Sequence, residues 1–153
     1  MAWFNKNESS APQTAPLTAQ RVSQWFESKG LDHQLIEEQE TVITGFDGVF
    51  VKVSCDHQRL SFQAALLEPA PAERYAAALS WSNHWNCVAV APTAIPTLNP
   101  DKGVEIEMGS ALVLGDAGCS DEQLDLFLST YSTLSVQALD EYKQAMGIED
   151  AAQ

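Results

Sequence analysis

The sequence has 153 residues, 45% of them hydrophobic, and a formal net charge of −13 from 8 basic and 21 acidic side chains. This length and composition suit one domain with one core. The negative charge repels polyanions, which argues against binding to nucleic acid or to anionic membranes. The sequence contains no apolar run long enough to cross a bilayer and no signal-peptide pattern, so we expect a cytoplasmic protein.

The two ends of the chain differ in composition from its middle. Residues 1–16 are rich in Ser, Pro, Ala, Asn and Gln and lack periodicity, which predicts a flexible tail, and residues 148–153 predict a flexible C-terminus. Trp3 and Phe4 can anchor a partner from such a tail, although simple exposure or self-packing is the alternative. We expect residues 17–147 to form a single domain.

The first half of the domain predicts one helix and three strands. Thr18 can cap a helix that ends near Gly30. The dipeptide Asp47-Gly48 is typical of a two-residue hairpin turn, because both positions tolerate a positive φ. Alternating hydrophobic residues predict three antiparallel strands in meander order, at residues 41–46, 49–53 and 60–66.

The next segment predicts a helix and two further strands. Pro71 suits the first turn of an alanine-rich helix that runs to about Asn86. A short strand is expected at residues 87–91, followed by an extended loop or sheet edge through Pro92, Pro96 and Pro100. Val104, Ile106 and Met108 alternate with glutamates, which predicts a strand within residues 103–114 that has one solvent-exposed face.

The last predicted element is a helix that begins after Ser120 and ends before Gly147. Ser120 and Gln123 have the spacing of a capping box. The complete predicted order is α-β-β-β-α-β-β-α. This order predicts an α+β domain in which a five-stranded, mainly antiparallel sheet carries its helices on one face.

Residue types that carry catalysis or bind metals are sparse in this chain. Cys55, Cys87 and Cys119 are widely spaced and odd in number, which suits a reducing compartment and a role as small buried hydrophobes. The sequence contains no close-spaced metal motif, no phosphate-binding loop and no nucleophile elbow. We therefore expect a protein without enzymatic activity, catalytic residues, bound metal or cofactor.

The densest unusual cluster lies on the second predicted helix. Trp81 and Trp85 lie one turn apart, as do Asn83 and Asn86. Stacking on the sheet and capping of the helix end are the favoured roles for these residues. A small-molecule site around the same four side chains is the alternative.

Acidic residues are concentrated after position 100. This part of the sequence contains eleven Asp or Glu residues and only two basic residues, Lys102 and Lys143, which gives a local net charge of −9. Glu105 and Glu107 share a strand face, and a solvated face explains them better than an acid/base pair does. These two residues, with three from the last helix, form a candidate acidic surface: Glu105, Glu107, Asp121, Glu122 and Asp125.

Three short motifs, in this order, resemble those of the YbjN-domain family of bacteria over about residues 17–142: Asn83-His84-Trp85-Asn86, Val104-Glu105-Ile106-Glu107 and Gly118-Cys119-Ser120-Asp121-Glu122-Gln123-Leu124. The proline-lysine step usual after the first motif is Ala91-Pro92-Thr93 here, so the role of that lysine does not carry over. The resemblance implies a sensory transduction regulator without established catalytic residues. It also implies a fold similar to that of type III secretion chaperones, which are acidic dimers that bind segments of other proteins.

The negative charge, the lack of catalytic and metal-binding motifs and the resemblance to the YbjN-domain family together predict a cytoplasmic, non-enzymatic regulatory protein. We expect it to act as a homodimer and to bind a protein or peptide through an exposed surface of its sheet. The alternative function is a small-molecule sensor with its pocket near Trp81 and Trp85.

Overall fold

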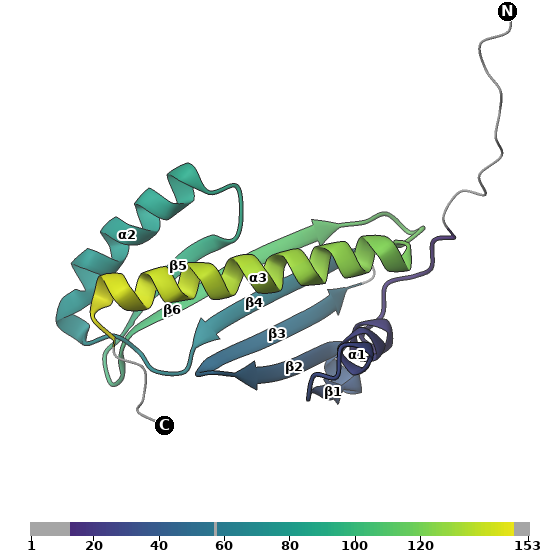
Figure 1. Cartoon of the computed structure of the whole chain (residues 1–153), viewed down its shortest axis with the longest axis horizontal. Helices are drawn as coiled ribbons and strands as arrows, with labels where there is room; N and C mark the ends of the chain where they lie inside the picture. Colours follow the sequence, from purple (N-terminus) through teal and green to yellow (C-terminus); the bar gives the residue numbers. More distant parts are fainter. Residues whose placement is uncertain (1–12, 57, 149–153) are drawn as a thin grey trace, which may run out of the picture.

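A computed structural model describes residues 13–56 and 58–148 (Figure 1). Trp3 and Phe4, the predicted anchors, lie outside these residues. The helices and strands are, in chain order, α1 (Ala19–Ser28), β1 (Gln34–Ile36), β2 (Thr41–Phe46), β3 (Val49–Asp56), β4 (Arg59–Leu66), α2 (Tyr75–Val88), β5 (Thr93–Asn99), β6 (Gly103–Val113) and α3 (Asp121–Met146). Two short 3-10 turns lie between them, at Glu37–Gln39 and Ala72–Arg74.

The strands form one antiparallel sheet in the order β1-β2-β3-β4-β6-β5. The predicted meander is its centre, formed by β2, β3 and β4. At the turn between β2 and β3, Asp47 and Gly48 have φ values of 47° and 75°, as a two-residue hairpin turn requires. Phe46 therefore pairs directly with Val49, and the predicted turn is confirmed.

Both predicted helix caps are also present. The hydroxyl of Thr18 accepts a hydrogen bond from the backbone N–H of Arg21 at the start of α1. At the start of α3, Ser120 accepts from the N–H of Gln123, whose side chain accepts from the N–H of Ser120. These reciprocal bonds satisfy two backbone donors that the helix itself leaves free.

Within the described residues the sheet has six strands, so the prediction of five strands was wrong. The additional strand is β1, whose residues Gln34–Ile36 pair with Thr41–Ile43. Three residues are too short for an alternating pattern to be visible in the sequence. The observed order therefore has one more strand than predicted between α1 and β2.

The strand predicted at residues 87–91 was also wrong. Cys87 and Val88 form the last turn of α2, and the strand starts later, at Thr93. Pro96 lies inside this strand, which is possible because β5 is at the edge of the sheet. The proline-containing segment that was expected to be a loop or an edge is therefore the fifth strand.

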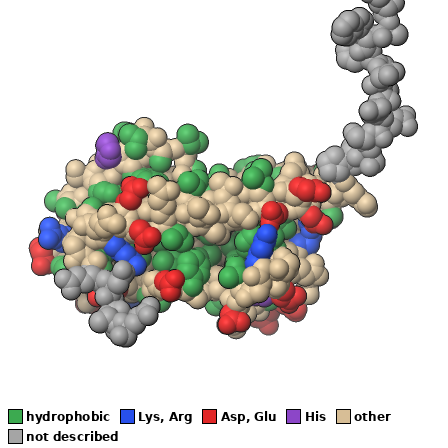
Figure 2. Space-filling model, in the orientation of Figure 1, with side chains coloured by type: hydrophobic (Ala, Val, Ile, Leu, Met, Phe, Trp, Pro, Cys, Tyr) green, Lys and Arg blue, Asp and Glu red, His purple; other side chains and the backbone are tan. Residues whose placement is uncertain are grey.

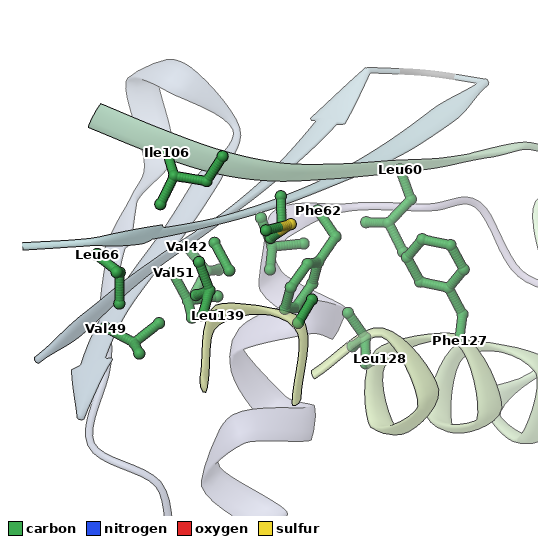
Figure 3. Close-up of a cluster of buried hydrophobic side chains, with 14 of the residues drawn as sticks. Val42, Val49, Val51, Leu60, Phe62, Leu66, Ile106, Phe127, Leu128 and Leu139 are labelled. Atoms are coloured by element: carbon green, nitrogen blue, oxygen red, sulfur yellow. The ribbon is translucent and has the colours of Figure 1, made fainter. Parts of the chain in front are cut away.

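The three helices of the described residues lie on one side of the sheet (Figure 1). α3 runs along β4 and β6 (Figure 1). α1 reaches α3 through the hydrogen bond from Trp25 to Asp125, and α2 reaches it where Trp81 packs against Tyr142. The sheet residues that face these helices, such as Val42, Phe62 and Ile106, are almost completely buried with Leu128 and Leu139 of α3 (Figure 3).

Candidate functional site

The opposite side of the sheet is not covered by any helix of the described residues, and we call it the open face. It carries the side chains that alternate with the buried ones in each strand. Phe50, Ile95 and Val113 on this face are 37%, 46% and 77% exposed. The open face therefore carries large apolar side chains, so it is less polar than the sequence predicted.

The strand register places four residues of the open face in one row. Phe50 of β3 pairs with Ala65 of β4, Ala65 pairs with Glu107 of β6, and Glu107 pairs with Ile95 of β5. Directly paired residues point to the same side of a sheet and lie next to each other. We call these four residues the Phe50 row. It combines apolar side chains with one half-buried carboxylate.

A second row runs beside the Phe50 row and contains Lys52, Gln63, Gly109 and Thr93. The amide of Gln63 donates a hydrogen bond of 2.9 Å to the carboxylate of Glu107, which fixes that carboxylate between the two rows. Gly109 has no side chain, and a Cβ at this position would touch both Ile95 and Glu107. The surface next to these two residues is therefore left accessible.

Glu105 and Glu107 share the open face, as their spacing predicted, but they have different partners. Asn99 and Lys102 lie 3.3 Å and 3.7 Å from Glu105, whereas Glu107 is bound by Gln63. An acid/base pair needs two carboxyl groups that converge on one reacting atom. Separate partners on a partly exposed surface instead fit the solvated face that the sequence favoured.

The other predicted acidic residues lie on the helix side, where α1 meets the start of α3. Asp125 is 2.7 Å from the ammonium of Lys29 and accepts a hydrogen bond of 2.8 Å from the indole N–H of Trp25. The bond from Lys29 and then the bond from Trp25 lower the pKa of Asp125. Glu122 is exposed in the same helical turn as Asp121.

Arg21 connects Asp121 to the chain that precedes α1. Its guanidinium forms an ion pair with Asp121 at 2.7 Å and donates to the carbonyl of Cys119 at 3.1 Å. It also donates to the carbonyls of Ala15 and Pro16. The residues predicted as one acidic surface are thus divided between the two sides of the sheet, and acidic side chains are spread over the helix side (Figure 2).

The tryptophan pair on α2 packs within the fold. Trp81 and Trp85 are stacked with ring centroids 5.6 Å apart, and Trp81 makes an edge contact with Tyr142. The indole N–H of Trp85 donates to the carbonyl of Pro92 at 2.8 Å. The described ring contacts of the pair are therefore to each other and to α3.

The two asparagines of the same cluster have different surroundings. Asn83 and Asn86 are both exposed residues, but the side chain of Asn86 makes two hydrogen bonds to the backbone of Ala94. Trp85 and Asn86 together hold the connection from α2 to β5. Their polar groups are therefore already used inside the fold.

Clefts lie around α1. One of about 380 Å³ is lined by Leu17, Thr18, Glu40, Cys55 and Asp56. Burial raises the pKa of the Cys55 thiol to about 12, with the nearby Glu40 carboxylate adding to the effect, so the thiol stays protonated. Cys55 and Cys119 are buried as expected, but Cys87 is exposed on the last turn of α2.

Within residues 13–56 and 58–148, no group of three or more His, Cys, Asp or Glu side chains is placed to hold a metal ion. None of the described helices combines the length and the hydropathy needed to cross a membrane.

The fold and the open face define a small α+β domain of the kind that presents one side of an antiparallel sheet. The chain belongs to the YbjN family, described as "Putative bacterial sensory transduction regulator", which matches residues 18–144. The family resemblance seen in the sequence is thereby confirmed. No curated protein matches the chain significantly.

Two solved structures are similar to this fold. The crystal structure of YbjN from E. coli, titled "a putative transcription regulator", has a TM-score of 0.71 and 14% sequence identity, over 84% of this chain and 92% of that one. The ExsC-ExsE complex contains a chain with a TM-score of 0.50 and 14% identity, over 88% of this chain and 95% of that one. At these identities the two structures establish a shared fold.

Sequence reasoning missed the apolar part of the open face. Phe50 lies between Val49 and Val51, which are both buried, so strict alternation directs it to the other side. Ile95 was assigned to an extended loop or a sheet edge, and its direction could not be read without the strand. Phe50 stands inside a continuous run of apolar residues, so the sequence does not show a polar residue at the position that faces away from the core. The direction of Phe50 could have been predicted from the alternation of Val49 and Val51 on either side of it.

Proposed function

We propose that this protein is a non-enzymatic regulatory module of the cytoplasm that binds a segment of another protein on its open face. The observation that carries the proposal is the exposure of Phe50 and Ile95 on a sheet surface without a covering helix. A contiguous apolar patch on the surface of a soluble protein marks an interaction site, and Phe50 with its neighbour Ala65 is the start of such a patch. The fold shared with the ExsC-ExsE complex, a complex of two proteins, supports the same class of function.

The Phe50 row gives this surface the composition of a binding site. Phe50 and Ala65 are apolar neighbours at one end of the row and Ile95 lies at the other end, and apolar anchors at the centre of an interface supply most of its free energy. Glu107, held by Gln63, offers an oriented acceptor between Ala65 and Ile95. A partner segment with apolar side chains and a donor such as Lys or Arg matches this combination.

A photo-crosslinking experiment tests the proposed surface. A photoreactive amino acid replaces Ala65, at the centre of the Phe50 row, and in a matched variant it replaces Ala145, which is exposed on α3. Irradiation in the native cytosol should give a discrete protein adduct from position 65 that is absent from position 145. The adduct should disappear when Phe50→Ser and Ile95→Ser are added. Identical adducts from both positions, or none at position 65, would contradict the proposal.

We further propose that the protein acts as a homodimer, as the chaperone-like resemblance implies. Sedimentation velocity should give a dimer above micromolar concentration. A single monomeric species at the highest soluble concentration would exclude this assembly without affecting the proposed open-face site.

The alternative function, a small-molecule sensor near Trp81 and Trp85, has weaker support. The indole N–H of Trp85 and the carboxamide of Asn86 are the polar groups that would orient a ligand, and both bind the backbone instead. A metabolite that changes the tryptophan fluorescence of the wild type but not of a Trp81→Phe variant would favour the sensor.

A further inference from the structure

β5 is the last strand of the described sheet on its side, and its outer edge faces no further strand. Its residues, Thr93–Asn99, include no charged side chain, and Ile95 and Leu98 are 46% and 42% exposed. An uncharged edge strand with exposed apolar residues can accept a strand from another molecule, so natural proteins usually protect such edges. The protection of β5 must therefore come from its proline, Pro96, or from another element of the fold.

The side chain of Asn86 occupies the first part of this edge. Its Oδ1 accepts a hydrogen bond of 2.8 Å from the N–H of Ala94, and its Nδ2 donates one of 2.9 Å to the carbonyl of Ala94. The N–H and C=O of one strand residue point to the same side, so both groups of Ala94 point away from β6. The carboxamide makes the two bonds that a residue of a neighbouring antiparallel strand would make.

The next two outward-facing residues follow at intervals of two. Pro96 has no N–H to donate. Leu98 pairs across the sheet with Val104, whose own N–H and C=O are both bonded to Ala70 on the side away from β5. Leu98 therefore directs its N–H and C=O outward. Asn86 occupies both groups of Ala94 and Pro96 has no N–H, so among these three residues Leu98 is the one that offers both a donor and an acceptor to another strand.

We propose that Asn86 and Pro96 together close the β5 edge against strand addition, and that the edge becomes a strand acceptor when both the carboxamide and the proline are replaced. The occupant is β5 of a second copy. In an antiparallel pair centred on Pro96, Ala94 of each chain lies opposite Leu98 of the other, and a twofold axis makes both contacts equal. Each such pair exchanges two hydrogen bonds once Ala94 is free. This inference is independent of the open face and its partner.

The proline at the centre of this pairing determines the design of the experiment. Pro96→Ala supplies the missing N–H and leaves Asn86 in place, so it is the control. The test variant combines Pro96→Ala with Asn86→Ala, and the two proteins then differ only in the carboxamide. A third variant adds Leu98→Lys to the pair, because a charged lysine at the edge opposes strand addition without restoring the bonds of Asn86.

Sedimentation velocity measures the outcome for all three variants and the wild type. We expect Pro96→Ala to keep the assembly state of the wild type, the double variant to form larger species as concentration rises, and Leu98→Lys to reverse that growth. The proposal is overturned if the first two variants assemble alike, or if the assembly persists with Leu98→Lys.

Hydrogen exchange on the wild type gives a test that does not depend on whether the variants fold. Both Ala94 and Leu98 direct their N–H groups outward, so the amide of Leu98 is the internal control for the amide of Ala94. We expect the Ala94 amide to exchange at least tenfold more slowly than the Leu98 amide. Equal exchange rates would mean that the carboxamide does not close the edge, and would overturn the proposal.

Discussion

Gly118→Ala should destabilise the fold by breaking the contact between the chain before α1 and the start of α3. Gly118 has a φ of 68°, and a Cβ at this position would overlap the carbonyl oxygen of Ala15. Ala15 and Cys119 exchange two backbone hydrogen bonds of 3.1 Å, so the overlap falls directly on this bridge. The alanine must push Ala15 away, and both bonds are lost.

The size of the effect follows from these two causes. A non-glycine residue held at positive φ costs roughly 1 kcal/mol at the lower end of the usual range. Two lost backbone hydrogen bonds add about 1 kcal/mol each. The expected loss of unfolding free energy is therefore about 3 kcal/mol, a large part of the roughly 5–15 kcal/mol that stabilises a typical domain.

Urea unfolding followed by tryptophan fluorescence measures this loss, with Gly115→Ala as the matched control. Gly115 lies in the same loop, but no heavy atom is within 4 Å of a Cβ at its position and its φ is not positive. The control should stay within about 0.5 kcal/mol of the wild type. The steric explanation fails if both variants unfold at the same urea concentration.

Three further predictions concern buried and exposed side chains of the sheet and helices. Phe62→Ala should cost about 3–5 kcal/mol in unfolding free energy because Phe62 is fully buried, whereas Phe50→Ala on the open face should cost under about 1 kcal/mol; equal losses would contradict the assignment of the two faces. A thiol reagent at pH 8 should modify exposed Cys87 in the native protein and leave Cys55, whose pKa is raised to about 12, unmodified; rapid labelling of Cys55 would be inconsistent with its burial. Burial also raises the pKa of the Tyr142 phenol to about 12. As pH rises, Cys55 and Tyr142 therefore lose their protons at a lower pH in the unfolded chain than in the folded protein. The free energy of unfolding should accordingly fall as pH rises above about 9. Tyr142→Phe should weaken this fall without loss of stability at pH 7, because the buried hydroxyl has no hydrogen-bond partner among the described residues; a large loss at pH 7 would point to a partner for it.

Features that depend on a few neighbouring residues could be predicted from the sequence. The cap at Thr18, the capping box at Ser120 and the turn at Asp47-Gly48 each form within four residues, so their geometry follows from local chemistry. The family resemblance and the central meander could be predicted for the same reason, because they rest on short motifs and on strands of at least six residues.

Features that depend on distant contacts could not be predicted. β1 has three residues and exists because Leu35 pairs with Val42, and β5 starts where Asn86 binds Ala94 across the connecting loop. The division of the candidate acidic residues has the same origin. Asp121 and Asp125 point to α1 because α3 lies on the helix side, and neither their spacing nor their charge indicates that side.

Arg21 limits when the contact between α1 and the start of α3 can form during synthesis of the chain. Its bonds to Cys119 and Asp121 join residues that are 98 and 100 positions apart. At a translation rate of roughly 5–20 residues per second, the ribosome needs about 5–20 s to add that length of chain. The N-terminal helix therefore leaves the ribosome long before these partners exist, and any nascent chain that stops short of α3 carries an arginine without its carboxylate.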